Sequence, residues 1–378
     1  MTAVALPGTE DHPHARMVLG AALSGMPSHA YLFHGPTGTG KRTAARALAA
    51  ELLAAGEADG DGARARVRAG THPDLTWVRP TGAHEMRVSD VDEAVVGAAT
   101  RTPFESSKRV FVLEGADTMS DAVANRMLKT LEEPPAYVHL ILLTDALGQV
   151  LETVVSRCQL VRFDPLPAER IASVLSGEGV EPGRAGACGR LALGNLTRAR
   201  FLASAEGEAL REDVERMVLD ALAGEERDVR AGEPWAPLLE RAEGAGREAA
   251  AAVAALGKER LADEPKGRDR SAIEREFDDT AKRDGRRART EVLDLGLELC
   301  ALAFRDLVCV AERAEGAVLG SDRVEALAPA ARGRDARRLR QAVERCEETR
   351  LSLALNVTEE LALSALTVRL RRLVGSAG

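Results

Sequence analysis

Residues 31–48 read YLFHGPTGTGKRTAARAL. An apolar run, a glycine-rich loop and a helical pattern follow one another here, which predicts a strand, a phosphate-cradling loop and a helix that begins near Arg42. Glycines let the backbone N–H groups of such a loop point inward at phosphate oxygens, and Lys41 would reach the outer phosphates. The candidate phosphate-binding residues are Gly35, Pro36, Thr37, Gly38, Thr39, Gly40 and Lys41. The competing interpretation is a loop that keeps this shape only for packing.

Arg42 stands where such loops normally carry serine or threonine. That hydroxyl is a ligand of the Mg²⁺ ion that bridges the outer phosphates, so a guanidinium at this position opposes metal binding. We expect Arg42 to take over the electrostatic part of the metal's role by pairing with a phosphate or with Glu114. Binding of Mg²⁺ is therefore expected to be weak or absent, and ATP is the candidate ligand.

Composition describes a globular protein with room for two or three domains, because 45% of the 378 residues are hydrophobic and 29% are charged. The net charge of −8 argues against an autonomous nucleic-acid-binding protein, which normally carries a basic surplus. The five cysteines form no C-x-x-C pair. The N-terminus MTAVALPGTEDHPHAR lacks the apolar run of a signal peptide, and no segment approaches the apolar length that a membrane span needs, so we expect a reduced, cytoplasmic setting.

Apolar runs of three or four residues alternate with helical patterns over residues 1–167, which is typical of a parallel sheet covered on both faces. The expected strands lie at residues 31–33, 76–78, 110–113, 140–143 and 160–163. Residues 168–210 show short helical patterns separated by glycines and predict a small helical lid. Residues 211–289 are expected to form a helical, charged connection. Residues 290–378 are expected to form an all-α domain from apolar-periodic segments at 292–311, 335–346 and 359–373.

Hydrolysis of ATP would require two adjacent acids at the end of a strand, one behind the metal and one to orient the attacking water. The candidate stretch is VFVLEGAD at residues 110–117. Glu114 could help to hold a metal, but Gly115 occupies the place of the second acid. Asp117 falls in the following turn, where an acid is more often a helix cap or loop residue than a base.

Further motifs follow along the first half of the chain: GTHPD at 70–74, EGADTM at 114–119, NRMLKTLEEPP at 125–135, LLT at 142–144 and SRC at 156–158. Together they resemble the bacterial clamp-loader ATPases of the AAA+ superfamily, and among these the delta prime subunits of DNA polymerase III. The stretch NVTEELAL at 356–363 resembles the end of delta prime subunits more loosely. The resemblance implies an AAA+ α/β domain, a helical lid and a C-terminal helical collar that joins subunits.

The resemblance also implies roles for individual residues. Thr144 matches the position that senses the γ-phosphate in active relatives, although a threonine that caps a strand end is the competing interpretation. Arg157 matches the arginine that reaches across a subunit boundary to the neighbour's γ-phosphate, a contact worth about 10³ to 10⁵ in rate in other phosphoryl-transfer systems. The alternative for Arg157 is an ordinary surface ion pair. Thr197 stands where active relatives carry a lid arginine, and Arg198 points about 100° away along the helix.

Arg42, Gly115 and Thr197 all depart from the active pattern, so we expect a subunit that does not hydrolyse ATP alone but lends Arg157 to a neighbour. The implied partners are the gamma/tau ATPase and delta subunits, with DNA contacted through the assembled hetero-oligomer. Zinc is not expected, because residues 56–70 lack the four cysteines usual in bacterial relatives, and His72 is expected to be structural. The alternatives are an ATP-hydrolysing gamma-type subunit and a P-loop kinase.

Overall fold

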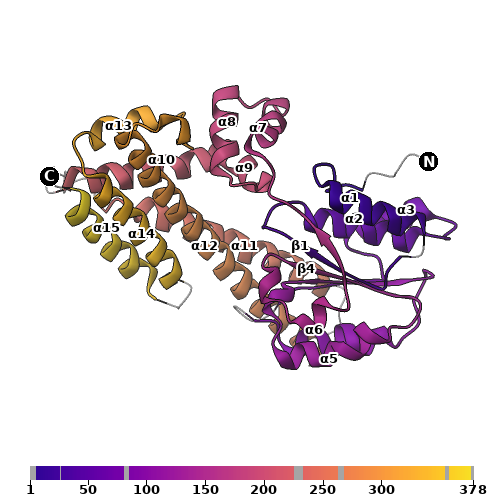
Figure 1. The fold of residues 1–378 in the computed structure, drawn as a ribbon. Coiled ribbons are helices and arrows are strands. Elements are labelled where there is room, and N and C mark those ends of the chain that lie inside the picture. The colour runs from indigo at the N-terminus through magenta and orange to yellow at the C-terminus, as the bar shows by residue number, and fades with distance from the viewer. Residues whose placement is uncertain are drawn as a thin grey trace. The chain divides into compact units, whose positions relative to one another are not determined.

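The computed structural model of the protein describes residues 6–25, 27–80, 85–224, 233–262, 268–353 and 357–375. These residues divide into two compact units (Figure 1). The first unit comprises Met1–Pro167 with Leu193–Thr197, and the second comprises Ala168–Ala192 with Arg198–Gly378. Asn356, the first residue of the 356–363 motif, lies outside the described residues. Over the described ranges, every helix is too short or too polar to cross a membrane.

A five-stranded parallel sheet forms the centre of the first unit, which confirms the expected fold class. Its spatial order is β2-β3-β4-β1-β5. The strands are β1 (Ala30–His34), β2 (Leu75–Val78), β3 (Arg109–Glu114), β4 (Val138–Thr144) and β5 (Gln159–Arg162). Leu32 of β1 lies between Leu142 of β4 and Leu160 of β5. Every residue of β4 is buried, as a central strand covered on both faces requires.

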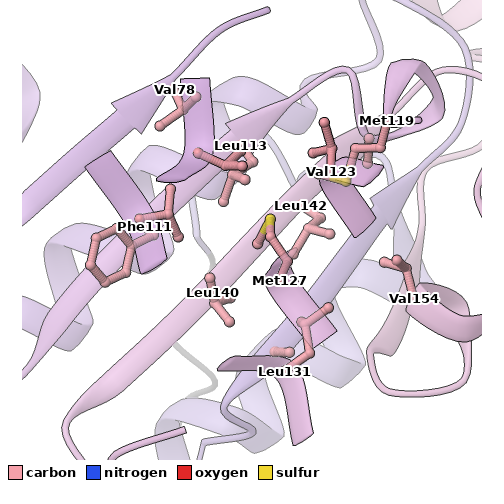
Figure 2. Close-up of a cluster of buried hydrophobic side chains, with 14 of the residues drawn as sticks. Val78, Phe111, Leu113, Met119, Val123, Met127, Leu131, Leu140, Leu142 and Val154 are labelled. Carbon is pink, nitrogen blue, oxygen red and sulfur yellow. The ribbon is translucent and has the colours of Figure 1, made fainter. Parts of the chain in front are cut away.

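Alternate side chains of the central strands pack into two separate hydrophobic cores, one on each face of the sheet. On one face, Phe111 and Leu142 pack in a cluster with Met127 of α5 (Asp121–Glu132), which Figure 2 shows close to Leu142. On the other face, Val112 and Ile141 pack in a cluster with residues of three helices. Those helices are α1 (Pro13–Ser24), α2 (Lys41–Ala54) and α3 (Gly60–Ala69). The two sets of helices cover opposite faces of the sheet (Figure 1).

Helix α5 buries one apolar side, with Val123, Met127 and Leu131 buried. Ser120 occupies its N-cap position, and its side chain makes no capping hydrogen bond. Short elements complete the first unit: α4 (Val88–Val91), a π-helix η1 (Asp92–Gly97), 3-10 turns η2 (Ala116–Thr118) and η3 (Leu147–Gln149), and α6 (Glu152–Val155). The turn η2 follows β3 and contains Asp117, and Arg157 lies just after the end of α6.

The second unit is helical throughout its described residues. Its first helices are α7 (Ala168–Gly177), α8 (Pro182–Leu191), α9 (Leu196–Ala203) and α10 (Ala205–Ala223). The long helices α11 (Ala236–Ala262) and α12 (Arg268–Ala311) follow. The last elements are the 3-10 turn η6 (Glu315–Ala317), α13 (Val324–Ala331), α14 (Ala336–Leu353) and α15 (Glu359–Val374). The three apolar-periodic segments expected at the C-terminal end lie in α12, α14 and α15, except that Asp335 precedes α14, whereas the sequence pattern did not indicate α13.

Helix α12 is continuous through residue 289, where we expected the connection to end and the C-terminal domain to begin. Glycines that would weaken an isolated helix are used here for close packing. A Cβ at Gly285 would lie 2.9 Å from the carbonyl oxygen of Gly246 in α11, and one at Gly246 would lie 2.8 Å from that of Gly285. The two helices therefore pack closely within the expected connection, and α12 continues past its expected end.

Candidate nucleotide-binding site

The phosphate loop (residues 35–41) connects β1 to α2, as the sequence predicted. Gly40 adopts a left-handed conformation with a φ of 96° and serves as the N-cap of α2, which begins at Lys41. The hydroxyl of Thr39 donates to the carbonyl oxygen of Pro36 at 2.8 Å and tightens the turn. All seven candidate phosphate-binding residues thus lie in one loop at the start of a helix, the usual place for binding an anion.

Lys41 is almost buried, with 7% of its side chain exposed. Its ammonium donates to the carbonyl oxygens of Gly35 at 2.5 Å and Pro36 at 2.7 Å, and it lies 2.7 Å from Oδ1 of Asp145. The hydroxyl of Thr37 donates to the other carboxylate oxygen of Asp145 at 2.8 Å. Burial lowers the pKa of Lys41, while the hydrogen bond and charge of Asp145 act to raise it. Asp145 is therefore the counter-ion of the loop lysine.

Arg42 pairs with Glu114, one of the two partners that we considered for it. Its Nη2 lies 2.6 Å from Oε2 of Glu114, whose side chain is 6% exposed. The other carboxylate oxygen accepts hydrogen bonds from Nε1 of Trp77 at 2.7 Å and from Nε of Arg79 at 3.3 Å. Three donors thus hold the carboxylate that would stand behind a metal ion.

These residues do not fit Mg²⁺. The hydroxyl ligand is replaced by the Arg42 guanidinium, and Glu114 is already engaged by donors from three side chains. Across the described residues, His, Cys, Asp and Glu side chains form no cluster of three or more that could hold a metal ion. The carboxylate that would stand behind the phosphate-bridging metal is therefore paired with a cation of the chain itself.

Gly115 follows Glu114 with a φ of 70° and a ψ of 44°, a left-handed conformation that other residues adopt at a cost of about 1–2 kcal/mol. A Cβ at this position would lie 3.0 Å from Cγ of Pro80 and 3.2 Å from Oγ1 of Thr118. The backbone conformation disfavours most residues other than glycine, asparagine and aspartate, and the available space disfavours any side chain, because Pro80 or Thr118 would have to shift. The turn itself therefore favours glycine at the position where the sequence pattern would place the second acid.

Thr144 and Asp117 contact each other, although 27 residues separate them. The hydroxyl of Thr144 donates to Oδ1 of Asp117 at 2.6 Å and accepts from the backbone N–H of Ala146 at 3.0 Å. Asp117 thus holds a strand-end threonine, which agrees with its interpretation as a loop acid. A role of Thr144 in sensing the γ-phosphate stays a prediction.

Arg157 follows α6 and forms an ion pair within its own chain. Its Nε donates to Oε1 of Glu132 at 2.9 Å, its Nη2 contacts the same oxygen, and its Nη1 donates to the carbonyl oxygen of Thr153 at 2.8 Å. The side chains of Arg157 and Glu132 are 32% and 48% exposed. In this chain by itself, Arg157 is a surface ion pair, and its role toward a neighbour stays a prediction.

The segment 193–197 brings a second side chain to the phosphate loop. A Cβ at Gly38 would lie 1.8 Å from Oδ1 of Asn195, so only glycine leaves room for this amide. Thr197 is the second residue of α9. Arg198 lies in the second unit, where its guanidinium contacts Glu298 at 2.9 Å and is mostly buried. Arg198 is therefore held by an ion pair within the second unit.

The cysteine-free stretch and the GTHPD element have structural roles. Residues 60–69 form α3, and Arg64 donates from two nitrogens to Glu51 at 2.8 and 2.9 Å. His72 is buried, and burial lowers its pKa. The carboxylate of Asp74, also buried, accepts the backbone N–H groups of residues 104–106 at 2.6, 2.9 and 2.9 Å. These contacts hold the loop before β3 in place.

Asp145 and Asn195 are the site residues that sequence reasoning missed. Asp145 had a usable signal, because it directly follows β4, and parallel strands carry their functional residues at the carboxyl ends. Asn195 had none, because its contact with Gly38 joins segments more than 150 residues apart.

Comparisons with known proteins agree with this geometry. Residues 14–167 match the family described as DNA polymerase III, delta subunit. The chain is 36% identical over 159 residues to DNA polymerase III subunit delta' of Bacillus subtilis, covering 41% of this chain and 48% of that protein. It is 38% identical over 146 residues to the delta' subunit of Pseudomonas aeruginosa, covering 37% and 44%. The resemblance to delta prime subunits is thus confirmed, and the chain spans about half the length of the curated relatives it matches.

Other matches are weaker or more distant. DNA polymerase III subunit gamma/tau of Mycobacterium tuberculosis is 32% identical over 174 residues, covering 43% of this chain and 29% of that protein. A solved structure, a DNA polymerase III gamma subunit-related protein from Thermotoga maritima, aligns with 96% of this chain and 99% of that one. The two share 13% identity with a TM-score of 0.49.

Proposed function

We propose that this chain, whose residues 14–167 match the delta subunit family of DNA polymerase III, serves as a delta prime-type subunit of a clamp loader in DNA replication. It does not hydrolyse ATP by itself, and it supplies Arg157 to a neighbouring ATPase subunit while a sliding clamp is loaded. The observation that supports this proposal is the Arg42–Glu114 pair at 2.6 Å, because it engages the carboxylate that would stand behind a metal ion with a cation of the chain itself.

The loop has what is needed to hold a nucleotide but not to cleave it. The backbone of the phosphate loop and Lys41 would bind the phosphates of ATP. A magnesium ion contributes several kcal/mol of transition-state stabilisation and needs the hydroxyl that Arg42 replaces. Gly115 stands at the position of the acid that would orient water, and Thr197 stands at the position of the lid arginine. These three departures together favour a delta prime-type subunit over the alternative of a gamma-type ATPase.

The pair between Arg157 and Glu132 does not oppose a role toward a neighbour. Both side chains are partly exposed, and such pairs contribute only about 0–1 kcal/mol. In other systems, a guanidinium that contacts a γ-phosphate in a neighbouring subunit raises the rate of phosphoryl transfer by about 10³- to 10⁵-fold. We therefore expect Arg157 to leave Glu132 readily when a neighbouring nucleotide is present.

The helical unit would provide the remaining parts of the assembly. We assign residues 168–210 to the lid, 211–289 to a connection and 290–378 to the collar. The direct partners would be the gamma/tau ATPase and delta subunits in the cytoplasm. DNA would be contacted through the assembled complex and mainly at its phosphates, because that kind of contact needs no sequence reading.

Reconstitution with the gamma/tau and delta subunits of the same organism tests the proposal. The measurement is DNA- and clamp-stimulated ATP turnover by complexes that contain wild-type chain or Arg157→Ala. Assembly should survive the substitution, and turnover should fall several-fold because one active site loses its trans cation. The isolated chain should show no ATP hydrolysis above background with Mg²⁺.

Glu132→Gln is the matched control, since it breaks the same intrachain pair but keeps the guanidinium. Turnover with Glu132→Gln should equal or exceed the wild-type value. Equal losses in both variants would mean that the pair is only structural, and wild-type turnover with Arg157→Ala would show that the trans role is wrong.

A further inference from the structure

We propose that Asp145 is an internal anion that competes with nucleotide for the phosphate loop, so that this chain binds a polyphosphate only when the Asp145 carboxylate withdraws. The inference rests on the proposed nucleotide-binding role of the loop. It adds a residue that sets the loop's affinity and that the sequence motifs did not indicate.

The ammonium of Lys41 has all three of its hydrogens engaged by the chain. Two backbone carbonyls of the loop and Oδ1 of Asp145 lie within 2.5–2.7 Å of Nζ. A nearly buried ammonium requires a counter-ion, because burial of an unpaired charge is costly. A phosphate that approaches Lys41 must therefore replace a partner, and Asp145 is the only anion among the three.

Asp145 closes the loop at two points. One carboxylate oxygen contacts Lys41 at the start of α2, and the other accepts the hydroxyl of Thr37 within the loop. The Asp145 side chain is 55% exposed, so it can turn into solvent without leaving a buried charge behind. If both anions stayed, a carboxylate and a phosphate would share one ammonium, and their mutual repulsion would disfavour that arrangement. Exchange of one anion for the other keeps Lys41 paired throughout.

The uncharged side chain of Asn195 also lies against the phosphate loop. Its side-chain oxygen occupies the space where Gly38 would carry a Cβ, 1.8 Å from that position. Residues from the end of β4 and from the segment 193–197 thus converge on a loop that would otherwise be open to an anion. The convergence supports a loop that is closed by the chain's own side chains, with Asp145 as its charged element.

Binding of a fluorescent ATP analogue to the isolated full-length chain tests the proposal, measured by anisotropy with and without Mg²⁺. Asp145→Asn keeps the size of the side chain and an acceptor for Thr37 but removes the charge. It should bind at least about tenfold more tightly than wild type, as expected for the loss of one competing charge-assisted contact. Lys41→Met in the same background should abolish the signal, which shows that the probe occupies this loop.

Asp164→Asn is the matched control, because it removes the same charge from an exposed residue that pairs with Arg162. Its affinity should stay within about threefold of wild type, since exposed charges are screened. Asp145→Ala is a second variant, and circular dichroism should show that each variant is folded.

Equal affinity of wild type and both Asp145 variants, including no binding by any of them, would overturn the proposal. An equal gain with Asp164→Asn would overturn it too, because the effect would then come from net charge. These outcomes are independent of the Arg157→Ala experiment, which measures turnover by other subunits in the complex. Failure of either proposal can therefore be recognised separately.

Discussion

The Arg42–Glu114 pair makes a quantitative prediction about the stability of the first unit. Replacement of Arg42 by Met leaves the Glu114 carboxylate with Trp77 and the more distant Arg79 as donors. Breaking a fully buried pair costs about 3–5 kcal/mol, whereas exposed pairs contribute about 0–1 kcal/mol. Glu114 is buried but 58% of the Arg42 side chain is exposed, so we expect an intermediate loss of about 1–2 kcal/mol.

A double-mutant cycle isolates the interaction from other effects of each substitution. The single variants are Arg42→Met and Glu114→Gln, and the double variant combines them. The double variant should be more stable than the sum of the single losses predicts, by about 1 kcal/mol. Trp77 and Trp235 are the two tryptophans of the chain, so a Trp235→Phe background leaves Trp77 as the sole reporter. Its indole donates to Glu114, and its fluorescence during urea unfolding reports on the first unit.

Arg126 and Asp92 provide a control pair in the same unit, 3.1 Å apart and with side chains 56% and 45% exposed. Arg126→Met and Asp92→Asn should show a coupling of no more than about 0.5 kcal/mol. Coupling between Arg42 and Glu114 that is no larger than this control would refute the argument. The guanidinium would then be a surface charge that happens to lie near Glu114, and it could not be said to replace a metal.

Two further predictions concern titratable groups of the first unit. Burial acts to raise the pKa of Asp74, but three backbone N–H groups outweigh it and the pKa is lowered. The Asp74 carboxylate therefore stabilises the fold above the unfolded pKa of about 4, and this contribution is lost as the pH falls through the folded pKa. Asp74→Asn should reduce the loss of unfolding free energy between about pH 4 and lower pH, as measured by urea unfolding at each pH. The same pH dependence in the variant and in wild type would contradict this. Burial raises the pKa of the Cys158 thiol to about 12. At pH 8, iodoacetamide should therefore modify Cys158 on the order of 10³-fold more slowly in the folded chain than in the unfolded chain, as measured by peptide mass spectrometry. Comparable rates would mean that the thiol is not buried.

The sheet was predictable because apolar runs carry its signal. The runs at 110–113 and 140–143 lie within β3 and β4, whose ends extend one or two residues further. The extra length of β4 includes His139, a polar residue that is buried because its Nδ1 lies 2.9 Å from the carbonyl oxygen of Ser28. A partner 111 residues away is invisible to local pattern, so strand ends of this kind cannot be predicted from apolar runs alone.

The site was predictable only where residue type and motif position coincide. Arg42 and Glu114 belong to motifs whose relative placement is fixed by strand, loop and helix, and their pairing followed from opposite charge. Thr37 and Asp145 are 108 residues apart, and no spacing rule connects them. The sequence pattern likewise did not indicate that α12 runs on through residue 289, because the contact of Gly285 with Gly246 joins segments that no local pattern connects.

The conformation of Gly115 bears on how this chain could change over evolutionary time. A return to an acid at this position would meet a backbone cost of about 1–2 kcal/mol and a crowded Cβ before any catalytic benefit could be felt. Selection acts on one substitution at a time, so a variant that carries only an acid at position 115 would bear this stability cost without a gain in activity. The shape of this turn therefore tends to keep a glycine at position 115 as the rest of the sequence changes.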